Sequence, residues 1–421
     1  MTPRRALVVG LALSGEAAAL ALRAAGADVV GYDRKPELER DVAGRLAAAG
    51  VEVHLGQEDI TLLRGVDVVV KSPGVPGELP LIAAARAERV PVWSEIELGA
   101  QLLPNPIVGV TGTNGKTTTT ALLGEVFRAA GRPVEVAGNI KPPLTSLVGR
   151  VAPDAWIVCE LSSFQLEDVE TLRPRIAVLL NLEPDHLDRH AGFEAYRDAK
   201  LRIFERQTED DVAVVPRGFG RVPGAARRVE FAAADELPGP LALSGEHNRE
   251  NAAAATAAAR AAGIGDSAIA QALAAFPGVE HRIEDVGSVG GVRFVNDSKA
   301  TNVAAALRAL AAFDAPLHVI LGGLGKHERY EPLAAAFGRG DRAYLIGAAA
   351  AEIASAFDAH GVPYERSGVL ATAVAAAAAQ ARPGEIVLLS PACASFDQFE
   401  SYEQRGDVFR GLVAGLEGYE P

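Results

Sequence analysis

The chain has 421 residues, of which 49% are hydrophobic and 23% are charged. These proportions exclude intrinsic disorder and predict two or three globular domains. With 41 basic and 54 acidic side chains the net charge is −13, so the basic surplus typical of nucleic-acid binding is missing and we expect no nucleic-acid partner. The two cysteines, Cys159 and Cys393, exclude a disulfide scaffold and suit the cytoplasm.

Short runs rich in β-branched residues alternate with stretches rich in alanine and leucine along almost the whole chain. The expected strands are 6–9, 28–32, 66–70, 107–110, 155–160, 176–181, 212–215, 292–296, 317–321, 343–346 and 385–390. This alternation predicts an α/β fold with parallel sheets and helical crossovers. No run of about 18 uncharged apolar residues occurs, so we expect no membrane span.

So many strands do not fit comfortably into one open sheet, which leads us to divide the chain. A proline-rich break at 103–106 precedes a new strand, and a second break at 276–279 follows a long alanine-rich helix. We therefore expect three α/β domains, at 1–104, 105–279 and 280–421.

A glycine loop with the sequence GLALSG at 10–15 follows the first expected strand and opens a helix. It fits the dinucleotide fingerprint GxGxxG except at Ala12, and Asp33 ends the next strand, where an acid that binds ribose would lie. Free N–H groups at the helix start can bind pyrophosphate, but Ala12 obstructs close approach of a dinucleotide. The loop favours a phosphate-bearing nucleotide over NAD, with plain strand–helix packing as the alternative. A loop at 71–75, KSPGV, is placed to approach the same ligand.

A phosphate loop is indicated by the sequence GVTGTNGKTT at 109–118, which follows a strand and precedes an expected helix at 119–130. Val110 stands where a strict Walker A pattern has glycine. The remaining glycines let N–H groups face anionic oxygens. Lys116 can neutralise the β- and γ-phosphates, and Thr117 can ligate Mg²⁺. The segment predicts an ATP site.

An ATP site of this kind needs a metal-binding carboxylate, and Glu160 ends an expected strand, where ligands of α/β proteins bind. Capping of the following helix is the alternative role for Glu160. His186, in the sequence NLEPDHLD at 181–188, follows another strand and can ligate a second Mg²⁺ as neutral imidazole. On composition alone, Lys200 is interpreted as a helix-surface lysine near Glu205.

Several motifs resemble the Mur ligases, the ATP-dependent amino-acid ligases of peptidoglycan synthesis. They are TGTNGKTT at 111–118, ELSSFQLE at 160–167, NDSKATN at 296–302, SPACASFDQF at 390–399 and EQRG at 403–406. The first is similar to that of folylpolyglutamate synthases as well, whereas the later motifs resemble the members that add D-glutamate. The resemblance covers essentially the whole chain. It implies an N-terminal Rossmann-like domain for a UDP substrate, a central P-loop ATPase-type domain and a C-terminal Rossmann-like domain for the amino acid.

The resemblance implies a two-step reaction that uses ATP and Mg²⁺, with two metal sites. The alanyl carboxylate of UDP-N-acetylmuramoyl-L-alanine attacks the γ-phosphate of ATP, and the amine of D-glutamate then displaces phosphate from the acyl phosphate. Phosphorylation supplies a leaving group because a carboxylate is a poor electrophile, and Mg²⁺ and lysines screen the repulsion between the anions. The implied partners are small molecules, and we expect a cytoplasmic monomer.

The resemblance also implies roles for individual residues. The catalytic residues would be Lys116, His186 and Lys200. The metal ligands would be Thr117, Glu160, His186 and Lys200 as its N-carbamate. The ATP-binding residues would be Gly112, Thr113, Asn114, Gly115, Lys116, Thr117, Thr118, Asn248, Asn251, Arg282 and Asp297. The UDP substrate would contact Leu13, Ser14, Asp33, Arg34, Gly74 and Asn139. D-glutamate would contact Lys299, Thr301, Lys326, Ser395 and Tyr402. Two positions depart from the family pattern, Lys141 in place of glycine and Tyr402 in place of phenylalanine.

Other functions compete with this interpretation. A Mur ligase that adds another amino acid would lack the motif at 390–399. A folylpolyglutamate synthase would lack the UDP-binding domain that the residues before the phosphate loop predict. A nicotinamide-dependent dehydrogenase would rest on the loop at 10–15 alone. A non-enzymatic ATP switch would hydrolyse ATP independently of any amino acid.

Overall fold

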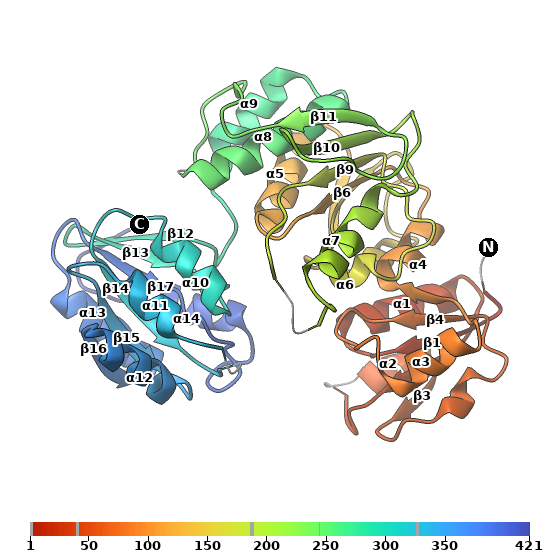
Figure 1. Cartoon of the computed structure of the whole chain (residues 1–421), viewed down its shortest axis with the longest axis horizontal. Coiled ribbons are helices and arrows are strands. Elements are labelled where there is room, and N and C mark those ends of the chain that lie inside the picture. Colours follow the sequence, from red (N-terminus) through yellow and green to blue (C-terminus); the bar gives the residue numbers. More distant parts are fainter. Residues whose placement is uncertain (1–2, 39–41, 186–188, 244, 326–327) are drawn as a thin grey trace. The chain divides into compact units, whose positions relative to one another are not determined.

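The computed structural model describes residues 3–38, 42–185, 189–243, 245–325 and 328–421. The chain divides into two compact units, Met1–Pro277 and Gly278–Pro421. The first unit contains two sheets and the second contains one (Figure 1). Within the described ranges, no helix combines the length and the apolar character needed to cross a bilayer.

The first sheet has five parallel strands in the order β3-β2-β1-β4-β5. Its strands are β1 (Arg5–Val9), β2 (Asp28–Asp33), β3 (Glu52–Leu55), β4 (Val68–Lys71) and β5 (Val92–Ser94). The accompanying helices are α1 (Leu13–Ala24), α2 (Val42–Ala48), α3 (Pro80–Ala87) and α4 (Glu95–Leu102). The strand order reverses between β1 and β4, so the loops that follow these two strands open into one crevice, where ligands of such sheets bind.

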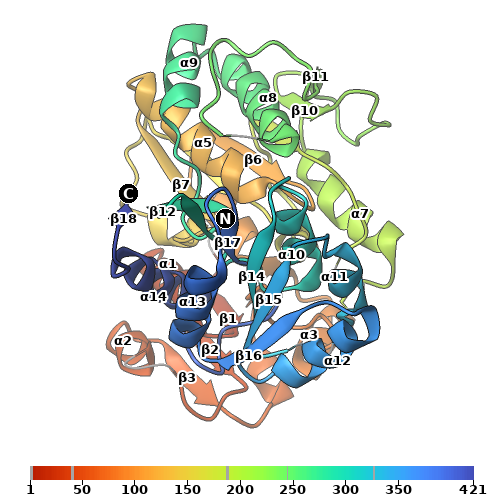
Figure 2. The same ribbon diagram turned by 90° about the vertical axis from the view of Figure 1, so that its left-hand side faces the viewer.

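The second sheet has six parallel strands in the order β11-β10-β9-β6-β8-β7. Its strands are β6 (Ile107–Thr111), β7 (Val134–Gly138), β8 (Trp156–Glu160), β9 (Ile176–Leu179), β10 (Val212–Pro216) and β11 (Arg227–Phe231). Its helices are α5 (Lys116–Ala129), α6 (Ser163–Leu166), α7 (Phe193–Leu201), α8 (Glu246–Ala261) and α9 (Asp266–Ala275) (Figure 2). The carboxyl ends of β6, β7, β8 and β9 meet at one edge of this sheet.

Alanine explains how α8 packs in this second layer. The buried alanines of the helix are Ala252, Ala253, Ala254, Ala255, Ala258 and Ala259. Their small side chains let α8 approach α5 and the strands β9, β10 and β11 closely. Alanine also has the highest intrinsic helix propensity, so composition and packing favour the same element.

The second unit contains one mixed sheet of seven strands in the order β16-β15-β14-β17-β13-β12-β18. Its strands are β12 (Glu284–Val289), β13 (Val292–Asn296), β14 (Leu317–Gly322), β15 (Arg342–Ile346), β16 (Tyr364–Gly368), β17 (Ile386–Leu389) and β18 (Tyr419–Glu420). The pairs of β12 with β13 and with β18 are antiparallel, and the others are parallel.

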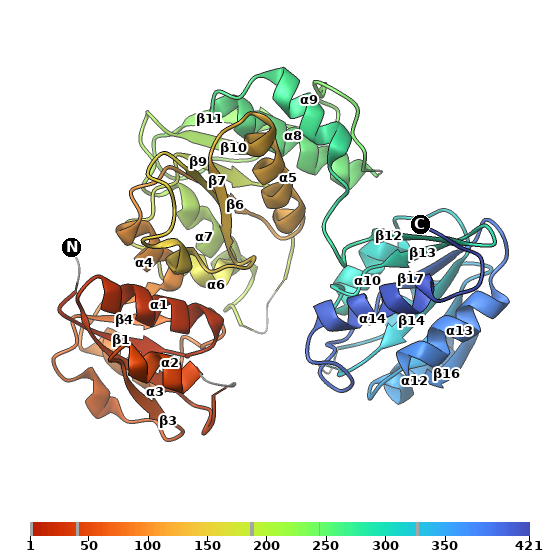
Figure 3. The same cartoon turned by 180° about the vertical axis from the view of Figure 1, so that it is seen from behind.

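Helices cover both faces of this sheet (Figure 3). One face packs against α10 (Val303–Leu310), α11 (Glu331–Ala336) and α12 (Ala350–His360). The other packs against α13 (Leu370–Gln380) and α14 (Tyr402–Ala414). Because β17 pairs in parallel with both β13 and β14, the carboxyl ends of these three strands lie together at one edge of the sheet.

The α/β class and all of the expected strands are confirmed, with small shifts at the strand ends. The sequence interpretation missed β3, β5, β7, β11, β12, β16 and β18. Compactness separates the chain at Pro277 and not near residue 104, so the domain limits at 104 and 279 stay predictions.

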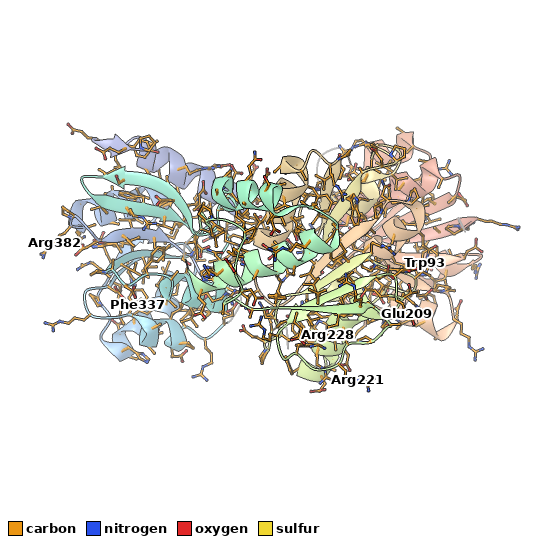
Figure 4. The ribbon with its side chains drawn as sticks, turned by 90° about the horizontal axis from the view of Figure 1, so that it is seen from above. Trp93, Glu209, Arg221, Arg228, Phe337 and Arg382 are labelled. Carbon is orange, nitrogen blue, oxygen red and sulfur yellow. The ribbon has the colours of Figure 1, made fainter. Side chains whose placement is uncertain are left out.

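The strand β11 is one of the missed edge strands, and it carries charged side chains. Arg228, labelled in Figure 4, forms an ion pair with Glu230, with 3.0 Å between Nε and Oε1. Arg228 also donates to the Gly220 carbonyl at 2.8 Å. These charged groups leave β11 with few of the apolar residues that mark an interior strand.

Candidate functional site

The glycine loop at 10–15 and the loop at 71–75 lie against each other, as the sequence predicts. The Ser72 hydroxyl donates to the Gly10 carbonyl at 2.7 Å, and a Cβ on Gly15 would collide with the same carbonyl oxygen. The Asp33 carboxylate accepts from the N–H of Leu11 at 2.7 Å. The glycines thus serve strand–helix packing, and Asp33 also shapes the loop.

Four other residues predicted for the UDP substrate lie in the loops and the helix start at this edge of the first sheet, whereas Asn139 belongs to the second sheet. Leu13 begins α1 and is 51% exposed. Ser14 follows it in the first turn of the helix. Arg34 and Gly74 are exposed in the loops after β2 and β4. The first turn of α1 is thus exposed at Leu13, and a helix start of this kind can bind phosphate.

The phosphate loop joins β6 to α5 and is held from both sides. The N–H of Asn114 donates to Asn181 Oδ1 at 2.8 Å. Gly115 has a φ of +80°, and a Cβ there would collide with Asn251 Oδ1. Asn251 on α8 therefore lies against the loop, as predicted, and only glycine fits between them. Lys116 folds over the loop, with Nζ 2.9 Å from the carbonyl oxygens of both Gly112 and Thr113.

Glu160 ends β8 and meets Asn139, which follows β7. The Asn139 side chain donates to Glu160 Oε1 at 2.7 Å, and its N–H donates to the Glu160 carbonyl at 2.8 Å. Glu160 is 3% exposed, and among the described residues its Oε2 has no hydrogen-bond partner. The helix α6 is capped by Ser162, whose hydroxyl accepts from the N–H of Gln165. The capping role considered for Glu160 is therefore wrong.

Lys141 departs from the family pattern in the loop after Asn139. The Lys141–Pro142 peptide bond is cis, and the Pro142 carbonyl accepts from the N–H of Gly138 at 2.9 Å. A Cβ on Gly138 would collide with the Glu160 carbonyl oxygen. The end of β7 is therefore closely packed against Glu160 with lysine in this position.

Lys200 is buried, contrary to the interpretation as a surface lysine. Its side chain on α7 is turned to the phosphate loop, where Nζ donates to the Gly112 carbonyl at 2.8 Å. Lys116 and Lys200 thus share one carbonyl oxygen. Burial, with the Lys116 ammonium nearby, lowers the pKa of Lys200 well below its usual value. Two lysines that converge on one edge of the sheet favour an anionic ligand. His186 lies outside the described residues.

The second unit brings together the motifs at 296–302 and 390–399, at the carboxyl ends of β13 and β17, beside the end of β14. The Ser390 hydroxyl donates to Asp297 Oδ2 at 2.9 Å, and the N–H of Gly322 donates to the Pro391 carbonyl at 2.8 Å. Asp297 is 5% exposed. Burial raises its pKa to about 6, although the Ser390 hydrogen bond and the Arg282 guanidinium act in the opposite direction.

Three of the residues predicted to bind the amino acid lie in the segments after β13 and β17: Lys299, Thr301 and Ser395. Ser395 is buried in the segment after β17. Lys299 Nζ lies 5.7 Å from the centre of the Tyr402 ring, a cation–π arrangement that tyrosine preserves where phenylalanine is expected. The N–H of Thr301 donates to the Lys299 carbonyl at 2.9 Å. Lys326 lies outside the described residues.

Comparisons with known proteins agree with this arrangement. Three family models match, described as "Mur ligase MurD-like, N-terminal domain" over 4–94, "Mur ligase middle domain" over 110–220 and "Mur ligase, glutamate ligase domain" over 281–393. The UDP-N-acetylmuramoylalanine--D-glutamate ligase of Acidobacterium capsulatum is 44% identical, with 99% of this chain and 97% of the relative covered. The chain belongs to the Mur ligase family.

Further Mur ligases extend these comparisons. The protein of the same name from Sphingopyxis alaskensis is 46% identical, with 98% of each chain covered. The crystal structure of UDP-N-acetylmuramate-alanine ligase MurC from Thermotoga maritima superposes with a TM-score of 0.59 at 19% identity, covering 97% of this chain and 98% of that one. At such low identity the structural likeness shows the fold alone, a Mur ligase fold with three domains.

Two residues missed in the sequence interpretation organise this Mur ligase site. Tyr196 precedes Lys200 by one helical turn on α7, its hydroxyl lies 2.9 Å from Thr113 Oγ1, and Lys200 Nζ lies 4.8 Å from its ring centre. The (i, i+4) spacing of Tyr196 and Lys200 on an expected helix was the available signal.

Arg405, on α14, is the second such residue: it lies in the motif at 403–406, was given no role of its own, and is fully buried. Its guanidinium donates to the Ser298 carbonyl at 2.8 Å and to the Cys393 carbonyl at 3.2 Å. It therefore ties together two motifs of the family. Arginine is rarely buried, so residue type gives no signal for this role.

We expect Asp297→Asn to stabilise the second unit at neutral pH. The pKa of Asp297 is about 6 in the folded protein, whereas its ordinary value is 3.8. The ionised carboxylate therefore destabilises the folded state. The loss in the free energy of unfolding is about 3 kcal/mol. This loss is fully present above about pH 6 and vanishes below about pH 4, where the carboxyl group is protonated in both the folded and the unfolded state. Asparagine carries no charge at either pH.

The measurement is hydrogen exchange of the β13 and β17 amides, in variant and unaltered protein at the same pH. The opening free energy should rise in the variant near pH 8 and differ little near pH 4. The exposed Asp285→Asn is the control and should change by no more than about 0.5 kcal/mol. A variant less stable at pH 8 would contradict the assignment of the strain to the Asp297 charge.

Proposed function

We propose that this chain ligates D-glutamate to UDP-N-acetylmuramoyl-L-alanine, through an acyl phosphate, with release of ADP and phosphate. The observation that carries the proposal is the pair Lys116 and Lys200 on the Gly112 carbonyl, beside the buried carboxylate of Glu160. The curated relatives named UDP-N-acetylmuramoylalanine--D-glutamate ligase, matched over nearly their full length, support the choice of substrates.

ATP would bind at the phosphate loop, from Gly112 to Thr118, with Asn248 and Asn251 of α8 beside it. Arg282 and Asp297 would contact it from the second unit. Lys116 would hold the β- and γ-phosphates and screen their charge while the substrate carboxylate attacks. The backbone of the loop supports this, since the positive φ of Gly115 allows the tight turn that packs the loop against Asn251.

Glu160 fits a role as a metal ligand, because its second carboxylate oxygen is buried and has no hydrogen-bond partner among the described residues. We propose that Thr117, Glu160, His186 and carbamylated Lys200 hold two Mg²⁺ ions. Mg²⁺, when bound, supplies positive charge that screens the phosphate oxygens. A carbamate on Lys200 would add an anionic oxygen near Glu160, and Mg²⁺ prefers oxygen ligands.

The UDP substrate and D-glutamate would bind at different sheets. The UDP substrate would contact Leu13, Ser14, Asp33, Arg34 and Gly74 at the first sheet, and Asn139 at the second. D-glutamate would contact Lys299, Thr301, Lys326, Ser395 and Tyr402. We propose that the enzyme works in the cytoplasm as a single chain, which suits its two free, buried cysteines.

The test is phosphate release from ATP in the presence of UDP-N-acetylmuramoyl-L-alanine and a panel of amino acids. We expect release with D-glutamate that depends on both substrates. Release with L-lysine or diaminopimelate but not with D-glutamate would assign the chain to another Mur ligase. Release that needs no amino acid would instead favour an ATP switch.

A further inference from the structure

The proposed substrate is long, because its pyrophosphate would lie at the glycine loop of the first sheet and its carboxyl group near Glu160 of the second. The spacing between these two places must therefore be held constant. Residues that fix this spacing need not touch the substrate. The joint between the first and second sheets is where such residues would lie, and it is formed within the first compact unit.

A buried ion pair spans this joint. Lys71, the last residue of β4, has Nζ 2.9 Å from Asp168 Oδ2, and the side chains are only 1% and 5% exposed. Arg86 on α3 also pairs with Asp168, at 2.7 Å from Oδ1, but it is 48% exposed. A buried pair loses hydration on both sides, so it contributes little net stability, whereas removal of one partner leaves an uncompensated buried charge. The contact is electrostatic, because Asp168 Oδ2 has no partner with hydrogen-bond geometry among the described residues.

On the side of the first sheet, Lys71 begins the loop at 71–75, which packs against the glycine loop at 10–15. Ser72 follows Lys71 directly, and its hydroxyl bonds the Gly10 carbonyl at 2.7 Å. The N–H of Ser72 donates to the Val9 carbonyl at 3.0 Å. A Cβ on Gly10 would collide with the Val75 side chain, so the two loops have no free space between them. Movement of Lys71 would therefore move the glycine loop.

On the side of the second sheet, Asp168 lies in the segment that begins at Glu160. Asp168 follows the short helix α6, and its carbonyl accepts from the N–H of Ser94 at 2.8 Å. Glu97 on α4 is fully buried and accepts from the N–H groups of Glu170, Thr171 and Leu172, each at 3.0 Å from Oε2. The segment that carries Asp168 is therefore bonded to both ends of the joint, and α4 and α6 lie side by side (Figures 1 and 3).

We propose that Lys71 and Asp168 are positioning residues. They set the distance between the glycine loop at 10–15 and Glu160 at the end of β8. The inference rests on the proposed function, since it concerns a substrate that spans both places. It predicts a distinctive pattern. A ligand that touches only the first sheet should be indifferent to the pair, whereas a ligand that reaches Glu160 should depend on it.

The test compares the binding of UDP with that of UDP-N-acetylmuramoyl-L-alanine by calorimetry, in the unaltered protein and in Lys71→Met. We expect the Kd of the full substrate to rise at least about tenfold, because a misplacement near 1 Å has effects of this order. The Kd of UDP should change by less than about twofold, and so should the KM of D-glutamate. Arg86→Gln is the matched control at the exposed partner and should leave all three values nearly unchanged.

The double variant Lys71→Met, Asp168→Leu removes both charges, so that no unpaired charge stays buried if the single variant folds poorly. It should fold and still bind the full substrate weakly. Equal weakening of UDP and the full substrate, or no weakening of either, would overturn the inference. If the unaltered protein fails to bind UDP-N-acetylmuramoyl-L-alanine, the proposed function itself is wrong.

Discussion

Replacing Lys200 with alanine is expected to lower kcat by at least about a thousandfold while the protein stays folded. The Lys200 side chain is buried on the phosphate loop, where it meets the carbonyl oxygen that Lys116 also contacts. Its lowered pKa increases the share of neutral amine, which is the form that reacts with carbon dioxide to give a carbamate. Loss of this group would remove a proposed anionic ligand beside Glu160.

The measurement is D-glutamate-dependent phosphate release, with and without a short-chain carboxylic acid that can occupy the space left by the side chain. Partial recovery with the acid is expected for Lys200→Ala. Lys200→Arg separates the two explanations, because arginine keeps the positive charge but forms no carbamate at this position. An arginine variant with nearly full activity would rule out the carbamate role. Circular dichroism should show unchanged folding in both variants.

Glu160→Gln is expected to lower kcat by at least about a hundredfold and to raise the Mg²⁺ concentration needed for half-maximal rate. Glutamine keeps the shape of the side chain and an oxygen that can accept from Asn139. The variant therefore removes the negative charge and spares the contact that fixes β7 to β8. The effect comes from Oε2, which is buried and lacks a partner among the residues that the structure describes.

Steady-state rates over a range of Mg²⁺ concentrations provide the measurement. Glu125→Gln serves as the control, since Glu125 is an exposed carboxylate on α5 that pairs with Arg128. An unchanged Mg²⁺ dependence in Glu160→Gln would show that Glu160 holds the loop and not a metal ion. A fall in thermal stability without any change in Mg²⁺ dependence would lead to the same conclusion.

Most interior strands could be predicted from the sequence, with the antiparallel β12 as the exception, and the edge strands could not. The outermost strands of the three sheets are β3 and β5, β7 and β11, and β16 and β18, and all of them were missed. Interior parallel strands are buried on both faces and read as continuous β-branched runs. An edge strand such as β11 (RRVEF) mixes charged and apolar residues, so its pattern does not differ clearly from a loop.

The candidate site shows a similar division. Lys116, Glu160 and Asp297 lie at or shortly after the carboxyl ends of strands, and in each sheet such positions gather at one edge. Composition alone placed Lys200 on a helix surface, and only the resemblance to the family implied a role for it in the site. The Lys71–Asp168 pair and the contacts of Arg405 join segments far apart in the sequence. Their meeting depends on packing between layers, which residue patterns do not encode locally.

The charged edge strand β11 has a consequence for the behaviour of the protein at high concentration. An unpaired edge offers N–H and C=O groups that can recruit the edge of a second copy and begin aggregation. On β11, Arg227, Arg228 and Glu230 stand in this position, and Arg228 also bonds the neighbouring Gly220 carbonyl. Bringing two such edges together would strip water from these charged groups, which opposes the pairing. The strand that was hardest to predict therefore protects its sheet from growing beyond one molecule.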